Sequence, residues 1–181
     1  ICDNPYCTVL WREVARAVSA AWSKVGVETV VEELRRKELY TLKNDRTAHD
    51  AVIWEGEGGS DPLLETRYYL PTTWESNYGI RWYKWWAGDL GAGEEPPAAV
   101  KRQYELFAQL RAQVGLAAQK QLMRQILELS ADQFYAMGIC LQGPGFGVVR
   151  ERFRNVPLVM PSAWSYPSPG PTLPCQYFLE P

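Results

Sequence analysis

Apolar residues recur at helical spacing near the start of the chain. The spacing predicts an amphipathic helix over residues 8–25, and Gly26 is a typical stop signal for such a helix. One face of the helix carries Leu10, Val14, Val18, Ala21 and Val25. The chain is therefore expected to begin its ordered part with a helix that buries one face.

Two apolar segments and a short helical pattern follow. Residues 27–34, V-E-T-V-V-E-E-L, are rich in β-branched side chains and predict a strand. Residues 38–43 predict a short helix, and residues 50–54, D-A-V-I-W, predict a second strand. Strands and helices in alternation with short connections are typical of α/β layers with parallel strands. The pattern predicts an α/β fold with a mostly parallel sheet flanked by helices.

The second half of the chain predicts two more helices. One opens at Pro96 or Pro97, where the missing proline N–H costs nothing, and the next carries Leu122, Ile126 and Leu129. Residues 134–141 are expected to run into a buried strand, and residues 147–157 to form an edge strand. The aromatic stretch 76–89 is too irregular to predict an element.

Proline dominates the end of the chain. Seven prolines lie in residues 157–181, and proline lacks a backbone N–H and has a fixed φ. This segment is expected to be an extended tail or a series of turns rather than a helix.

Charge and composition exclude several classes of protein. Nineteen basic and twenty-one acidic side chains, without a basic block, argue against a nucleic-acid partner. The single histidine argues against a zinc centre and against a histidine-based catalytic triad. For the non-catalytic function favoured below, no metal, cofactor or catalytic residue is predicted. The four cysteines leave open whether a disulfide forms, because the compartment decides that. They are Cys2, Cys7, Cys140 and Cys175.

Candidate chemistry is concentrated after the predicted strand 50–54. Glu57 follows that strand, and ligands of open α/β sheets bind beyond the carboxyl ends of strands. Gly58 and Gly59 allow a ligand to approach the backbone, and a carboxylate at this place accepts hydrogen bonds from an ammonium or a hydroxyl group. Local sequence leaves open an ordinary solvated turn, as well as a glycosidase pair that includes Glu55.

Aromatic residues are unusually frequent, with eight tryptophans and ten tyrosines. Such rings either fill a core or stack on a ligand. Trp54, Tyr68 and Trp74 are the candidates for ligand contact, because they flank the glycine-rich turn. The predicted ligand-binding residues are thus Trp54, Glu55, Glu57, Gly58, Gly59, Tyr68 and Trp74.

Three segments, in order, resemble the C-terminal part of the family 5 extracellular solute-binding proteins of ABC transporters, which bind peptides, nickel or opines. They are W-S-K-V-G-V-E-T-V-V-E-E-L from Trp22, D-A-V-I-W-E-G-E-G-G-S-D-P from Asp50, and F-R-N-V-P with the proline-rich tail. In peptide-binding members an aspartate in the second segment holds the ligand's amino group. Glu57 stands at the matching position, and its longer side chain leaves opines, sugars and other polar solutes open.

The resemblance implies a fold and partners. The fold is a lobe of the type II periplasmic-binding-protein kind over residues 1–156, followed by a tail, residues 157–181, that returns towards an N-terminal lobe outside this sequence. The partners are a small polar solute, an ABC permease and that missing lobe. The location is periplasmic or extracellular, with membrane association through the transporter.

The expected function is non-catalytic capture of a peptide-like or other amine-bearing solute for an ABC importer. One alternative is a sugar- or opine-binding receptor of the same family. Another, from a different class, is a carbohydrate-active enzyme that uses Glu55 and Glu57.

Overall fold

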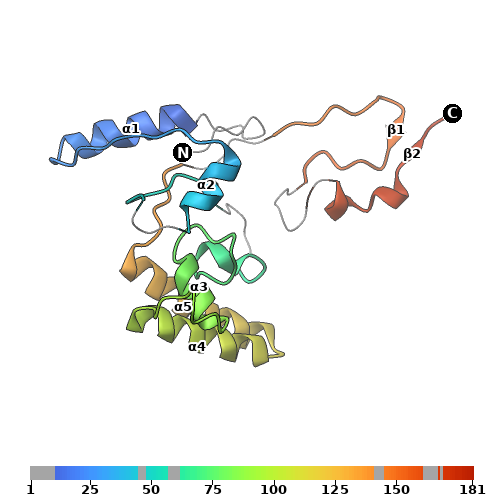
Figure 1. Cartoon of the computed structure of the whole chain (residues 1–181). Helices are drawn as coiled ribbons and strands as arrows, with labels where there is room; N and C mark the ends of the chain where they lie inside the picture. The colour runs from blue at the N-terminus through green and yellow to red at the C-terminus, as the bar shows by residue number, and fades with distance from the viewer. Residues whose placement is uncertain (1–10, 45–47, 57–61, 141–144, 161–166, 168) are drawn as a thin grey trace.

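The structure is a computed structural model and describes residues 11–44, 48–56, 62–140, 145–160, 167 and 169–181. It consists mainly of helices joined by long irregular segments (Figure 1). The α-helices are α1 (Trp11–Ser23), α2 (Arg36–Leu42), α3 (Ile80–Trp86), α4 (Ala98–Ala112) and α5 (Leu116–Gln133). The short elements are the 3-10 turns η1 (Thr66–Tyr68), η2 (Gly170–Thr172) and η3 (Pro174–Gln176) and the strands β1 (Phe153–Arg154) and β2 (Phe178–Leu179).

The hydrophobic core lies between α4 and α5, which pack against each other as a helical hairpin (Figure 1). Val100, Leu106, Met123 and Ile126 are almost fully buried there. Burial of side chains of this size contributes about 1.5–3 kcal/mol each, so the hairpin is the main source of stability in the described part of the chain.

Two polar side chains of α4 attach the preceding loop to this core. The Tyr104 hydroxyl donates to the Pro71 carbonyl oxygen at 2.7 Å, and Gln103 Nε2 lies 3.5 Å from the Tyr69 carbonyl oxygen while it donates to the Ile126 carbonyl oxygen of α5 at 3.0 Å. The Trp86 ring stacks on Tyr104 with 4.9 Å between ring centroids. These contacts fix residues 69–71, and through them the loop that forms one side of the candidate site.

The predicted α/β fold is wrong. Among the described residues the only sheet is the antiparallel pair β1–β2, in which Phe153 pairs with Leu179 and Arg154 with Phe178. The segments 27–33, 50–54 and 134–140 form no strand. The expected edge strand 147–157 is reduced to the two residues of β1.

The segment 27–34 shows why a sequence rich in β-branched residues does not by itself form a strand. It runs back along α1, held by Arg12, which donates two hydrogen bonds of 2.6 Å to Glu33, and by a 2.6 Å bond between Thr29 and Ser19. Val30 stays 99% exposed. A strand needs a neighbouring backbone to supply a ladder of hydrogen bonds. Here only Leu34 forms an isolated bridge, and Thr29 and Glu33 are held by side chains of α1.

The predicted helices are confirmed with shifted ends, as α1, α2, α4 and α5. Gly26 adopts φ +85° as the last residue of the turn that follows α1, as expected of a helix stop. Helix α3 was not predicted, because tryptophan and tyrosine are mediocre helix formers. It forms because Trp82 and Trp86 pack against the core, so tertiary contact outweighs intrinsic preference.

The described residues at the end of the chain, 169–181, form mainly turns, as the prolines there predict. Within the described part, η2 and η3 lead into β2, which returns antiparallel to β1. Figure 1 shows this β1–β2 segment extending away from the helices. Cys140 and Cys175 are exposed free thiols, whereas Cys2 and Cys7 lie outside the described residues. None of the helices in the described ranges combines the length and hydropathy needed to cross a membrane.

Candidate functional site

A small cavity lies between α2 and the loop of residues 65–76, and we call it the aromatic hollow. Its volume is about 30 Å³, whereas a cavity needs about 10–15 Å³ to hold one water molecule. The cavity therefore accommodates one small group of a ligand rather than a whole solute. Its lining consists of Arg36, Tyr40, Trp54, Glu55, Arg67, Tyr68 and Glu75.

Helix α2 supplies two lining residues through its periodicity. Arg36 and Tyr40 are four residues apart and so share one helix face. The Glu38 side chain closes the helix start, because its Oε2 accepts a 3.1 Å hydrogen bond from the Arg35 backbone N–H, as the glutamate of a capping box does. This cap fixes the first turn, in which Arg36 lies.

Trp54 forms a wall of the hollow and is held by rings on two sides. Its ring centroid lies 5.7 Å from that of Trp11 in α1 and 5.7 Å from that of Tyr40 in α2. The next residue is fixed through its backbone, because Asn77 Nδ2 donates to the Glu55 carbonyl oxygen at 3.0 Å. Residues 54 and 55 are thus placed by aromatic packing and one hydrogen bond, without a sheet.

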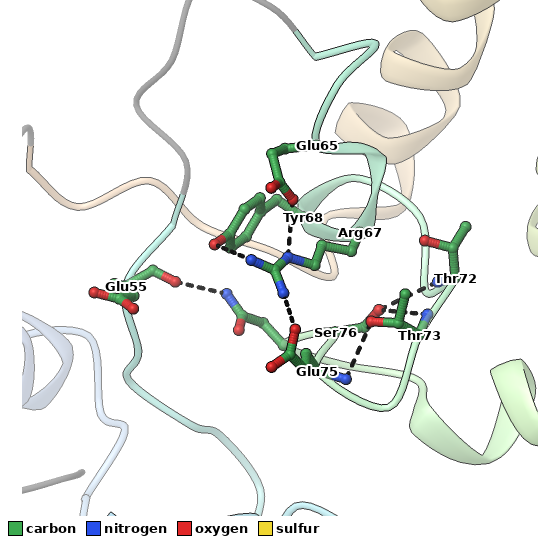
Figure 2. A network of polar contacts seen from close by, with 9 residues as sticks. Glu55, Glu65, Arg67, Tyr68, Thr72, Thr73, Glu75 and Ser76 are labelled. Carbon is green, nitrogen blue, oxygen red and sulfur yellow. Dashed lines mark hydrogen bonds and ion pairs between the residues drawn. The ribbon is translucent and has the colours of Figure 1, made fainter. Parts of the chain in front are cut away.

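Arg67 organises the opposite side of the hollow (Figure 2). Its guanidinium forms an ion pair with Glu75 and donates to the Tyr68 hydroxyl at 3.3 Å. Its Nε lies 2.9 Å from Glu65 Oε2, as an ion pair rather than an aligned hydrogen bond. The Arg67 and Glu65 side chains are 13% and 12% exposed, so this ion pair is poorly screened by solvent.

A tight turn presents Glu75 to Arg67 (Figure 2). The buried Ser76 hydroxyl accepts hydrogen bonds from the backbone N–H groups of Thr72 and Thr73, at 3.2 and 3.3 Å. Thr73 Oγ1 in turn accepts from the Glu75 N–H at 3.1 Å. Side chains that bond their own backbone in this way stabilise turns, and the T-T-W-E-S sequence provides them.

A cation of the chain lies against each aromatic wall. The Arg36 guanidinium carbon is 5.6 Å from the centroid of Tyr40 and 5.9 Å from that of Trp54. Arg67 lies 5.1 Å from the centroid of Tyr68. Cations within about 6 Å of a ring centroid are attracted by the ring quadrupole. The rings of the hollow thus lie against positive groups of the chain itself.

A second cation, Lys43, contacts Tyr40, with its Nζ 5.3 Å from the ring centroid. Lys43 is 7% exposed, and its Nζ has no hydrogen-bond partner within the described ranges. Burial lowers the pKa of Lys43 from 10.5 to about 8, against the opposing effect of the Glu75 carboxylate, while Arg67 lowers it further. Burial also raises the pKa of Tyr68, partly offset by Arg67.

We expect Lys43→Met to stabilise the fold by about 2 kcal/mol at pH 7, since one pKa unit corresponds to about 1.4 kcal/mol and contact with Tyr40 and water offsets part of the cost. Between about pH 8 and 10.5, the Lys43 amine is neutral in the folded state but still protonated in the unfolded chain. Unfolding therefore takes up a proton between about pH 8 and 10.5, and wild-type stability rises through that window.

Urea unfolding of both proteins from pH 7 to 10.5 checks this. The gap between Lys43→Met and wild type is expected to close as the pH rises. The exposed Lys37→Met on the same helix is the control and is expected to change stability by less than about 0.5 kcal/mol at every pH. A constant gap would show that Lys43 does not titrate in this window.

Three of the predicted ligand-binding residues come together here. Trp54, Glu55 and Tyr68 all line the hollow. Trp74 does not line it but packs behind Tyr40, with 5.6 Å between their centroids. Glu57, Gly58 and Gly59 lie outside the described residues, so the carboxylate pair of the enzyme alternative is not defined. That these residues contact a solute stays a prediction.

Four lining residues were not predicted: Arg36, Tyr40, Arg67 and Glu75. The spacing of Arg36 and Tyr40 on a predicted helix was a usable signal for a shared face. The position of Arg67 between Glu65 and Glu75 in a loop also favoured an ion-pair network. Neither signal says that the two segments meet, because that contact depends on how the loop packs on α4.

No protein-family model matches the chain, and no curated protein is significantly similar to it.

Proposed function

We propose that this chain binds an amine-bearing polar solute, without catalysis, and that the aromatic hollow receives the amine. The observation that carries the proposal is the cation placed against each aromatic wall of the hollow. Rings that attract the chain's own guanidinium groups attract a ligand ammonium for the same electrostatic reason.

Two further features support an amine. The cavity volume of about 30 Å³ suits a group the size of water, as an ammonium is. Glu55 and Glu75 both line the hollow, and carboxylates form charge-assisted hydrogen bonds with ammonium groups.

We further propose that solute capture serves an ABC importer, with a permease as partner. The support is the sequence around D-A-V-I-W-E-G-E-G-G-S-D-P and the proline-rich tail. Trp54 and Glu55 belong to that segment and also line the hollow. The importer role therefore rests on the motif segments, and the hollow supplies the chemistry of solute binding.

Isothermal titration with the dipeptide alanyl-alanine tests the solute proposal. We expect saturable binding to the wild-type chain, with about tenfold weaker binding for Trp54→Ala and for Glu55→Gln, because each loses about 1.4 kcal/mol of ring or charge interaction with the ammonium. Matched controls are Trp85→Ala on α3 and Glu128→Gln on α5, which lie outside the hollow. Their affinities are expected to stay within twofold of wild type.

Wild-type affinity in both hollow variants would refute the assignment of the amine to this site. An equal loss in the controls would do the same, since the effect would then come from general destabilisation. Circular dichroism of each variant separates loss of binding from loss of fold.

A further inference from the structure

Lys43 carries a buried amine next to the hollow without lining it. It directly follows α2, is 7% exposed, and its Nζ has no hydrogen-bond partner among the residues that the structure describes. The Nζ lies 5.3 Å from the centroid of the Tyr40 ring, which is one of the walls of the hollow. The ring that would receive a solute amine is therefore already in contact with an amine of the chain.

The charges of the hollow act on this lysine. Burial lowers the pKa of Lys43 to about 8, with Glu75 acting against this shift and Arg67 adding to it. Both Glu75 and Arg67 line the hollow. A positive group that enters the hollow acts on Lys43 in the same direction as Arg67 and lowers its pKa further. Such coupling is reciprocal, so protonation of Lys43 lowers the affinity of the hollow for a cation by the same factor.

We infer that Lys43 makes solute capture depend on pH: the protonated side chain opposes a solute cation in the hollow, and the neutral side chain allows the cation to bind. This inference rests on the proposed function and adds the regulation of the same site. Arginine side chains stay charged at all relevant pH values. Among the described cations that contact the rings of the hollow, only Lys43 therefore responds to pH.

The neighbours of Lys43 do not account for a response in the same pH range. The groups that act on Lys43 are Glu75 and Arg67 from the neighbouring loop and the Tyr40 ring from α2. Carboxylates as a class titrate at about pH 4, well below the range in which Lys43 does. Burial raises the pKa of Tyr68, which moves that hydroxyl away from the range. A change in cation affinity near pH 8 is thus assigned to Lys43.

The contact distances set the size of the effect. A cation attracted by a ring lies within about 6 Å of its centroid, so a solute amine on Tyr40 lies no more than about 11 Å from Lys43 Nζ. At low salt and an effective dielectric constant of about 20, two like charges at this distance change an affinity by about tenfold. We expect that factor between the protein with protonated Lys43 and the protein with neutral Lys43.

Isothermal titration with alanyl-alanine at pH 6 and low salt tests the effect on affinity. At this pH both Lys43 and the dipeptide amine are protonated, so wild type shows the full repulsion. We expect Lys43→Met to bind about tenfold more tightly, because it keeps a long side chain without the charge. The control is Lys37→Met, which removes an exposed charge of α2 outside the hollow. Its affinity is expected to stay within twofold of wild type.

Proton release provides a second readout, which a purely structural role of Lys43 would not change. Repeating the titration at pH 7 in two buffers of different protonation enthalpy measures the protons released on binding. Tenfold coupling shifts the pKa of Lys43 from about 8 to about 7. Wild type should therefore release about 0.4 more protons per bound dipeptide than Lys43→Met. At pH 6, where Lys43 stays protonated in both states, the release by wild type should fall to about 0.1 proton, so this comparison does not depend on the variant.

The outcomes separate this inference from the proposed function. If wild type binds the dipeptide and Lys43→Met binds it equally or more weakly, Lys43 does not regulate the hollow, while the solute site stands. The same conclusion follows if wild type releases no more protons at pH 7 than at pH 6. An equal gain in Lys37→Met would indicate general electrostatics and overturn the inference. If neither wild type nor Lys43→Met binds, both proposals fail.

Discussion

Arg67→Ala is expected to lower the free energy of unfolding by about 3 kcal/mol, as is typical when one partner of a poorly exposed ion pair is removed. The reason lies in the two glutamates that Arg67 holds. Glu65 is 12% exposed, and it and Glu75 would keep their charges in a loop that has lost its counter-ion. Mutual repulsion would then open the turn that forms one side of the hollow.

Chemical denaturation followed by circular dichroism measures this effect. The matched control is Arg124→Ala on α5, whose ion pair with Glu128 is 3.8 Å long and joins highly exposed side chains. Such a pair contributes at most about 0.5 kcal/mol. Adding Glu65→Gln and Glu75→Gln to Arg67→Ala should restore most of the lost stability, because no unpaired charge remains. Similar stabilities of Arg67→Ala and Arg124→Ala would contradict the account of the network.

Ile126→Ala is expected to destabilise the protein by about 3–4 kcal/mol, the usual range for a fully buried aliphatic side chain cut to alanine. Ile126 is 0% exposed and lies in the core between α4 and α5. Its carbonyl oxygen also accepts the Gln103 hydrogen bond, which the substitution leaves in place. The loss therefore reports on packing alone.

Leu116→Ala is the matched control in the same helix, because Leu116 is 57% exposed. Its expected effect on the unfolding free energy is below about 1 kcal/mol. Equal effects of the two substitutions would mean that the α4–α5 hairpin is not the centre of stability. Thermal unfolding of both variants measures the difference in stability between them.

Helices were predictable from this sequence, and strands were not, for a physical reason. The hydrogen bonds of α4 and α5 close within each helix, so the apolar period around Val100 and Ile126 was a sufficient signal. Strand 27–34 required a partner elsewhere in the chain. The polar contacts Arg12–Glu33 and Thr29–Ser19 show that it lies along α1 instead, which no local pattern reveals.

The candidate site was predictable in part. The aromatic and acidic residues after residue 50 marked Trp54, Glu55 and Tyr68 as residues of interest, and these three line one cavity. The cationic side of that cavity comes from α2 and from Arg67, and it depends on long-range packing of Tyr40 against Trp54. Side chains brought together only by tertiary contact have no signature in sequence spacing.

The central claim is that the aromatic hollow receives the amino group of a solute. The most direct measurement is a pair of titrations of the wild-type chain, one with alanyl-alanine and one with N-acetyl-alanyl-alanine, which lacks the positive charge. We predict that the free dipeptide binds at least tenfold more tightly, since only an ammonium is attracted by the rings and carboxylates of the hollow. Equal affinities for the two dipeptides, or binding of neither, would contradict the claim.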